Sequence, residues 1–130
     1  MTVALIVDDN PTNLDVLEQM LKREGVSTYS VLSPRDLETD LAGMGPVDVV
    51  FLDLEFPNYD GLDLIHTLRE DPRLRTARFI AYTVHISEQN EVRDAGFDGF
   101  LGKPLSVEDF PHHLQRILNG EPVWEVGSQY

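Results

Sequence analysis

The sequence predicts an α/β protein whose doubly wound, five-stranded parallel sheet carries helices on both faces. Three observations support this fold class. Short apolar runs alternate along the chain with segments of helical period, which is the order expected of strand–helix units. Residues 47–53 are mostly Val, Phe and Leu, as in strands that are buried on both faces. The connections are short, and 130 residues suffice for one domain with its own core.

Each expected strand is a short apolar run. The expected strands are residues 3–7, 26–32, 47–53, 79–83 and 97–101. The run at 26–32 is the weakest of them. Strands of a parallel sheet share one carboxyl edge, and open α/β folds keep their sites at that edge. Residues that follow these runs are therefore the first candidates for function.

Helix starts are marked by caps and prolines. They lie at Pro11 or Thr12, at Ser33-Pro34, after Asp60-Gly61, at Ser87 and at Ser106. Gly96 ends the fourth helix. Residues 106–109 form a capping box for the last helix, and Pro111 removes a backbone donor, so we expect a kink or a delayed start there. The apolar seam of this helix is expected to be Phe110, Leu114, Ile117 and Leu118.

Composition narrows the classes of function. The net charge of -13 and a total of two lysines argue against nucleic-acid binding, which needs clustered basic residues. No cysteine is present for a disulfide, a thiolate metal site or a thiol nucleophile. The start lacks a basic leader and no apolar run is long enough to cross a membrane, so a cytoplasmic domain is expected. Residues 1–119 should form this domain and residues 120–130 a tail, whose Trp124 packs on the body or binds a partner.

Three carboxylates follow the first and third expected strands. Asp8 and Asp9 come directly after the first strand, and Asp53 ends the third. A nucleotide-binding domain would carry a glycine-rich turn after its first strand, and this turn is acidic. Neighbouring carboxylates repel one another unless a cation lies among them, and Mg²⁺ prefers such oxygen ligands. The sequence therefore predicts a magnesium site; the alternative for Asp8 and Asp9 is a simple helix cap.

Two further residues are expected at the same edge. Thr83 ends the fourth strand and Lys103 follows the fifth. A lysine at a strand end pairs with carboxylates or with a phosphoryl oxygen as a point charge. Taken singly, the threonine is an ordinary strand residue and the lysine an ordinary loop residue. Together with the carboxylates they form a set suited to phosphoryl chemistry.

At this point the chain resembles the receiver domains of two-component response regulators, which have a flavodoxin-like fold. The resemblance covers residues 2–119. Its motifs are Val7-Asp8-Asp9-Asn10, Leu52-Asp53-Leu54 with Pro57 and Asp60-Gly61, Tyr82-Thr83, Ala95-Gly96, and Phe100-Leu101-Gly102-Lys103-Pro104. Each motif alone is weak, and the five in this order are highly specific.

The resemblance implies a role for each residue of the set. Asp53 would accept a phosphoryl group from the phosphohistidine of a sensor histidine kinase or histidine phosphotransfer protein. Mg²⁺ would be held by Asp8, Asp9, Asp53 and the backbone carbonyl of Glu55. Lys103 and the Thr83 hydroxyl would bind phosphoryl oxygens. Phe100 would be the aromatic switch residue, moving as Thr83 moves toward the phosphate.

The chain also departs from the family's pattern. Val84 stands where a small residue is usual, and we expect it to narrow access to Asp53. Glu55 and His85 flank the expected path of attacking water, so we expect them to tune the lifetime of the phosphoryl group. The stretch from Thr83 to Lys103 is shorter than usual, so the resemblance fixes neither the length of the fourth helix nor the output face.

Three functions are compatible with this site. The first is a phosphorylated, Mg²⁺-dependent switch that signals to an unknown downstream protein and catalyses only its own phosphoryl transfer and dephosphorylation. The second is an interaction module of the same fold that signals without phosphorylation, which has no need for the full set of site residues. The third is a phosphatase with an aspartate nucleophile, for which Glu55 is a suitable second acid but whose usual cap insertion has no room here. The sequence favours the first.

Overall fold

A computed structural model describes residues 2–56, 58–84 and 86–125. Its main sheet has six strands in the order β2-β1-β3-β6-β7-β8, all paired in parallel. The strands are β1 (Val3–Val7), β2 (Ser27–Val31), β3 (Val49–Leu52), β6 (Arg78–Thr83), β7 (Gly99–Gly102) and β8 (Val123–Glu125). The predicted doubly wound α/β fold is confirmed, with one strand more than the five expected.

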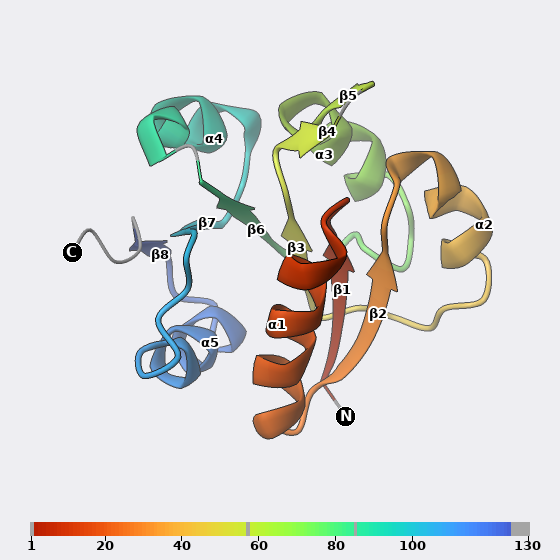
Figure 1. Cartoon of the computed structure of the whole chain (residues 1–130). Helices are drawn as coiled ribbons and strands as arrows, with labels where there is room; N and C mark the ends of the chain where they lie inside the picture. Colours follow the sequence, from red (N-terminus) through yellow and green to blue (C-terminus); the bar gives the residue numbers. More distant parts are fainter. Residues whose placement is uncertain (1, 57, 85, 126–130) are drawn as a thin grey trace.

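Helices cover both faces of this sheet (Figure 1). They are α1 (Pro11–Arg23), α2 (Leu37–Leu41), α3 (Gly61–Arg69), α4 (Gln89–Ala95) and α5 (Phe110–Leu118). Apolar side chains of α1 and α5 join one core layer with Ile6 and Phe51, and those of α2, α3 and α4 join the other with Val50 and Phe79. Residues alternate between the two layers along β3, which explains why its sequence is apolar throughout.

The helix termini follow the signals in the sequence. The Asn10 side chain caps α1 by accepting hydrogen bonds from the backbone of Thr12 and Asn13. A 3-10 turn (Pro34–Asp36) precedes α2, and another (Ile86–Glu88) precedes α4, which ends at Gly96 in the left-handed conformation (φ 98°). Helix α4 is therefore short, in keeping with the short stretch between Thr83 and Lys103.

The last helix shows a delayed start and no long seam. Helix α5 begins at Phe110, and Ser106 Oγ accepts a hydrogen bond from the Asp109 backbone at 3.2 Å before it. Pro111 lies in the first turn, where a missing backbone donor costs little. Phe110, Leu114 and Ile117 are buried, but Leu118 is 37% exposed, so its predicted place in the seam is wrong.

Two short elements were absent from the prediction. The turn after Asp53 forms a small antiparallel pair, β4 (Glu55–Phe56) with β5 (Tyr59–Asp60). Gly61 follows it, where a side chain would come within 2.7 Å of the Asp53 carbonyl oxygen, so glycine is needed for this close approach. The second element is β8, which lies in the expected tail and adds the sixth strand. The division at residue 119 itself stays a prediction.

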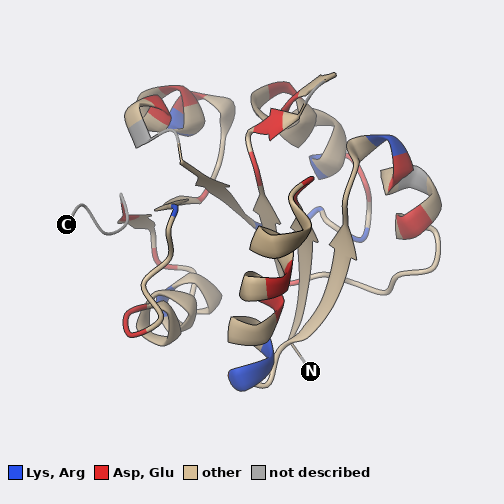
Figure 2. Ribbon diagram, viewed as in Figure 1, with Lys and Arg blue, Asp and Glu red and all other residues tan. Residues whose placement is uncertain are grey.

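The negative charge is spread over the molecule. Figure 2 shows acidic segments on α1, α2 and α4 as well as around the strand ends. The acidity is thus not confined to the strand ends. No described helix is long and apolar enough to span a bilayer.

Candidate functional site

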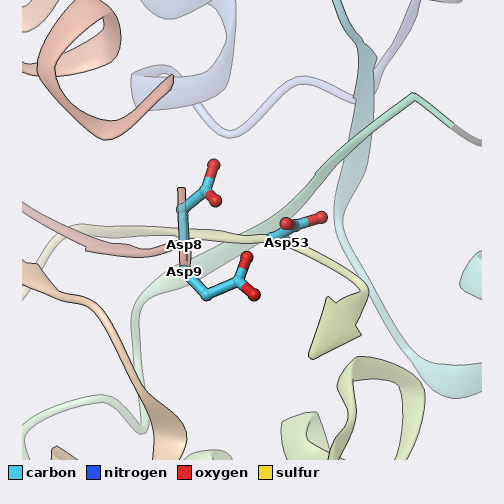
Figure 3. A group of neighbouring side chains, drawn as sticks. All are labelled: Asp8, Asp9 and Asp53. Atoms are coloured by element: carbon cyan, nitrogen blue, oxygen red, sulfur yellow. The ribbon is translucent and has the colours of Figure 1, made fainter. Parts of the chain in front are cut away.

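The carboxyl edge of the sheet brings the three predicted carboxylates together. Asp8 follows β1 and Asp53 follows β3, and the Asp53 backbone amide donates to the Val7 carbonyl at 3.0 Å. Asp8, Asp9 and Asp53 each offer an oxygen within 4.8 Å of the others, and Figure 3 shows the three side chains grouped at these strand ends. Parallel pairing of β1 with β3 therefore creates the cluster from residues 44 and 45 positions apart in the sequence.

Backbone groups hold two of these carboxylates in place. The Asn10 amide donates to Asp8 Oδ1 at 2.9 Å, and the Leu54 amide donates to Asp53 Oδ1 at 2.8 Å. Asp8 is fully buried and Asp53 is 8% exposed, whereas Asp9 is exposed. Buried carboxylates require partners, so the positions of their second oxygens matter most.

Lys103 supplies the cation for both buried carboxylates. Its Nζ lies 2.9 Å from Asp8 Oδ2 and 3.6 Å from Asp53 Oδ2. The loop that carries it is fixed beside β6 by a hydrogen bond from its own amide to the Thr83 carbonyl at 2.8 Å. The Lys103 ammonium also lies 4.2 Å from the centre of the Tyr82 ring, and the Tyr82 hydroxyl donates to the Asn13 carbonyl at 3.2 Å. A single lysine thus contacts two acids and one aromatic ring.

The environment of Asp53 changes its acidity. Burial is the largest effect and raises the pKa of the Asp53 carboxyl from 3.8 to about 6. Lys103 opposes this rise, the nearby Asp8 adds to it, and the backbone amides of Leu54 and Glu55 oppose it. A raised pKa means that the charged form of Asp53 is under-stabilised by the protein alone.

This donor set fits a hard divalent cation. Mg²⁺ takes oxygen ligands and usually keeps several waters, and the exposed Asp9 leaves the cluster open on one side. An added cation would offset the repulsion between Asp8 and Asp53 that Lys103 offsets only in part. The acidic cluster is therefore consistent with Mg²⁺ binding. The predicted contribution of the Glu55 backbone carbonyl stays a prediction.

A cavity of about 720 Å³ opens over Asp53. Its lining includes six predicted site residues: Asp9, Asp53, Glu55, Thr83, Val84 and Lys103. Val84 is 61% exposed at this opening. Asn13 and Glu88 also line the cavity and were not predicted, because neither belongs to a motif. His85 lies outside the described residues.

Thr83 and Phe100 lie deeper in the structure. Thr83 is fully buried and pairs with Gly102 across β6 and β7. Phe100 pairs with Ala81 and is also fully buried, but it does not line the cavity. Its ring instead stacks on that of Trp124 in β8, with centroids 6.4 Å apart and planes 10° from parallel. The structure thus separates the expected switch aromatic from the acidic cluster.

Comparison with known proteins identifies the family. Residues 4–115 match the response regulator receiver domain family. The chain belongs to this family. Its fold, its motifs and the acidic cluster agree with that membership, which places the domain in two-component or phosphorelay signalling.

Relatives of this receiver domain occur in larger and smaller proteins. The chain is 32% identical over 97% of its length to the hybrid signal transduction histidine kinase L of Dictyostelium discoideum, of which it spans 8%. It is 34% identical over 78% of its length to stress response regulator protein 1 of Meyerozyma guilliermondii, of which it spans 49%. A receiver domain (CheY-like) structure from Methylobacillus flagellatus is 30% identical, with a TM-score of 0.78 and coverage of 90% of this chain and 98% of that one.

Proposed function

We propose that the Asp53 carboxylate accepts a phosphoryl group from the phosphohistidine of a sensor histidine kinase or a histidine phosphotransfer protein. The phosphorylated domain then signals to a downstream protein by direct contact. One observation carries this proposal: Asp53 lines an open cavity, where it lies beside the carboxylates of Asp8 and Asp9 and its Oδ2 is 3.6 Å from the Lys103 ammonium. Receiver domains interact with such histidine-phosphorylated proteins, and a cytoplasmic location agrees with this role.

The transfer requires a carboxylate nucleophile. An Asp53 carboxylate oxygen attacks the phosphorus, the P–O bond forms as the P–N bond to histidine breaks, and the histidine nitrogen leaves with the bonding electron pair. Mg²⁺ held by Asp8, Asp9, Asp53 and the Glu55 carbonyl would supply positive charge to the transferring oxygens. Lys103 Nζ lies 3.6 Å from Asp53 Oδ2, close enough to bind a phosphoryl oxygen there as a point charge.

The bound phosphoryl group then alters its surroundings. It adds charge and acceptor oxygens next to Thr83, whose hydroxyl donates to one of them. Thr83 belongs to the same sheet edge as Lys103, and a shift of its side chain changes the packing of the neighbouring strand β7. Phe100 on β7 transmits that change as the switch aromatic.

Residues at the opening control how long the phosphoryl group stays. Val84 narrows the entrance, and Glu55 and His85, which follow Asp53 and Thr83 by two positions in the sequence, act on the hydrolytic water. We expect Glu55→Ala and His85→Ala to change the rate of autodephosphorylation. The rate is measured as the loss of phosphoryl label from Asp53. Equal rates in wild type and in both variants would contradict this role.

Phosphorylation of the intact chain tests the proposal. Incubation with Mg²⁺ and a phosphorylated kinase or acetyl phosphate should give one acid-stable, base-labile phosphoryl group on Asp53. Asp53→Asn should give none, and Asp40→Asn, which changes an exposed aspartate outside the cavity, should label like wild type. Beryllofluoride binding is measured in parallel with phosphorylation, because Val84 can exclude acetyl phosphate from Asp53.

The other two functions give different results. No adduct from any donor, and no beryllofluoride binding, would favour an interaction module that signals without phosphorylation. Continuous release of phosphate from unrelated esters would favour a phosphatase.

A further inference from the structure

Strand β8 occupies the edge of the sheet beside β7. It pairs in parallel through Gly99 with Val123, Phe100 with Trp124 and Leu101 with Glu125. Figure 1 shows β8 next to β7, with α4 and α5 on either side. This segment comes after the region that matches the family, residues 4–115, so the match does not account for it.

Trp124 connects β8 to both β7 and α4. Its ring stacks on the buried Phe100 ring, and the Arg93 guanidinium of α4 lies 4.0 Å from its centroid. Trp124 thus contacts an aromatic ring and a cation, two favourable partners for an indole. A change in the position of Phe100 would therefore alter its contact with Trp124.

The ends of β8 are held by α5. Arg116 donates to the Pro122 carbonyl at 3.1 Å and forms an ion pair with Glu121 at 3.8 Å. His113 Nε2 lies 3.7 Å from Glu125 Oε1. These contacts are polar and half-exposed or exposed, so each contributes little to stability, and the docking of β8 depends mainly on Val123 and Trp124.

Gly99 shows that β7 is shaped to receive this strand. A Cβ at position 99 would lie 2.8 Å from the Val123 carbonyl oxygen and 2.9 Å from Ile80 Cδ1. Only glycine allows Val123 to approach this closely, and Val123 is 1% exposed as a result. The sequence of β7 therefore fits the occupied edge.

We propose that the edge of β7 between α4 and α5 is a regulated strand-binding surface whose occupant is the chain's own segment Pro122–Glu125. Phosphorylation of Asp53 releases this occupant through Phe100 and Trp124. The inference rests on the proposed function of Asp53. After release, the unpaired backbone of β7 becomes available to an extended partner segment that presents an aromatic side chain opposite Phe100.

The coupling has a reciprocal consequence. If phosphorylation weakens the docking of β8, then loss of docking must strengthen ligand binding at Asp53 by the same factor. Removal of the Trp124 ring should therefore tighten beryllofluoride binding. Coupling between two sites typically amounts to roughly 5- to 150-fold, so at least about a fivefold gain is expected.

The single tryptophan of the chain reports on this segment directly. In the full chain with Mg²⁺, beryllofluoride should shift Trp124 emission to longer wavelength and speed the exchange of the β8 amide protons. Trp124→Leu should bind beryllofluoride at least about fivefold more tightly than wild type. Trp124→Phe keeps an aromatic ring on Phe100 and should retain an affinity near that of wild type. Arg93→Gln, which loosens one face of Trp124, should lie between the two.

The outcomes separate this inference from the proposed function. Binding of beryllofluoride to wild type is measured by ¹⁹F NMR. If it binds without a change in Trp124 emission or in the exchange of the β8 amide protons, the inference is overturned and the proposed function stands. An unchanged affinity in Trp124→Leu would also overturn it. Failure of wild type to bind beryllofluoride or to accept phosphoryl from any donor would overturn both. The emission and exchange measurements need no variant, so a misfolded Trp124→Leu would not prevent the test.

Discussion

Asp53 and Asp71 each lie beside a basic side chain, yet the pKa values of their carboxyl groups move in opposite directions. Asp53 follows the buried strand β3, and burial raises its pKa to about 6 although Lys103 lies 3.6 Å away. Asp71 follows α3, and the Arg73 guanidinium, hydrogen-bonded to both of its oxygens at 2.9 and 2.7 Å, lowers its pKa. The two regions differ in burial and in how the cation is presented.

This difference shows what each region is built for. Arg73 offers a two-point fork to one partly exposed carboxylate, so the charge of Asp71 is matched locally. Lys103 offers one ammonium to two buried carboxylates and lies closer to Asp8 than to Asp53. The pair at the loop stabilises the fold, whereas the group at the sheet edge keeps negative charge that Lys103 does not fully match, which is consistent with a metal site.

Removal of Lys103 should have the largest effect on stability. Lys103→Gln leaves two buried carboxylates without their cation, and loss of one partner of a buried ion pair typically costs about 3–5 kcal/mol. Urea unfolding in metal-free buffer at pH 7 measures this loss. Mg²⁺ should restore part of the stability, because it offsets the same charges.

The other lysine provides the matched control for that experiment. Lys22 is exposed near the end of α1, where a cation stabilises the helix by about 0.3–1 kcal/mol. Lys22→Gln should therefore lose about 1 kcal/mol at most, with no recovery in Mg²⁺. Equal losses in Lys103→Gln and Lys22→Gln would contradict the role given to Lys103.

The next largest effect is the dependence of stability on pH that Asp53 imposes. Between its ordinary pKa of 3.8 and its folded value of about 6, the unfolded carboxyl ionises while the folded one keeps its proton. The free energy of unfolding should thus fall as pH rises through this window and level off above it. The shift of about two pKa units corresponds to at most about 3 kcal/mol.

Asp53→Asn removes the contribution of the Asp53 carboxyl to the pH dependence of stability. In metal-free buffer the variant should lose less stability than wild type between pH 4 and pH 6, and should be up to about 3 kcal/mol more stable at pH 7. Denaturant unfolding at a series of pH values gives the comparison. Parallel pH profiles for wild type and Asp53→Asn would show that burial of Asp53 carries no such cost.

The residues at the sheet edge were predictable from the sequence because each of them directly follows or ends a strand that the sequence also predicts. The apolar runs before Asp8, Asp53 and Thr83 fix which edge of the sheet those side chains share, and Lys103 follows the last run in the same way. Parallel pairing brings strand ends together whatever the details of packing. The fold and the composition of the acidic cluster follow from this logic, whereas the family came from the resemblance of the five motifs.

The sequence did not predict the partners of individual side chains or the very short strands. The pairing of Lys103 with Asp8 ahead of Asp53 depends on fractions of an ångström. Strand β8 has three residues, too few for any periodic pattern, and it forms because Gly99 and Phe100 offer a complementary edge. Tyr82 belongs to one of the motifs, but its contact with Lys103 depends on the path of the loop that carries Lys103. No residue pattern predicts that path.

Tyr82 sharpens the contrast between the two cations. Arg73 is oriented by its own fork and by a hydrogen bond to the Leu41 carbonyl, whereas Lys103 lacks a fork and lies against the Tyr82 ring. A buried cation–π contact is worth about 2 kcal/mol, so Tyr82→Leu should slow phosphorylation of Asp53 by about tenfold or more.

Tyr82→Phe separates this positioning role from packing. It keeps the ring but loses the hydroxyl that bonds the Asn13 carbonyl, so its phosphorylation rate should stay near that of wild type while stability falls by about 1 kcal/mol. Rates measured at saturating Mg²⁺ over a range of donor concentrations give the comparison. A Tyr82→Phe variant as slow as Tyr82→Leu would assign the effect to the hydroxyl and not to the ring.

The smallest effect is expected where the charge is already matched. Asp71→Asn breaks the fork with Arg73 in a partly exposed loop, and pairs of this kind contribute less than about 1 kcal/mol at pH 7. The pKa of Asp71 is lowered by folding, so its contribution is present above the ordinary value of 3.8 and is lost as pH falls through the lower folded value. Asp71→Asn should accordingly be slightly less stable than wild type at pH 7, and the two should converge in acid. This sign is opposite to that of Asp53→Asn, which should be more stable than wild type at neutral pH, so unfolding curves of both variants in one pH series decide whether burial or cation geometry controls each aspartate.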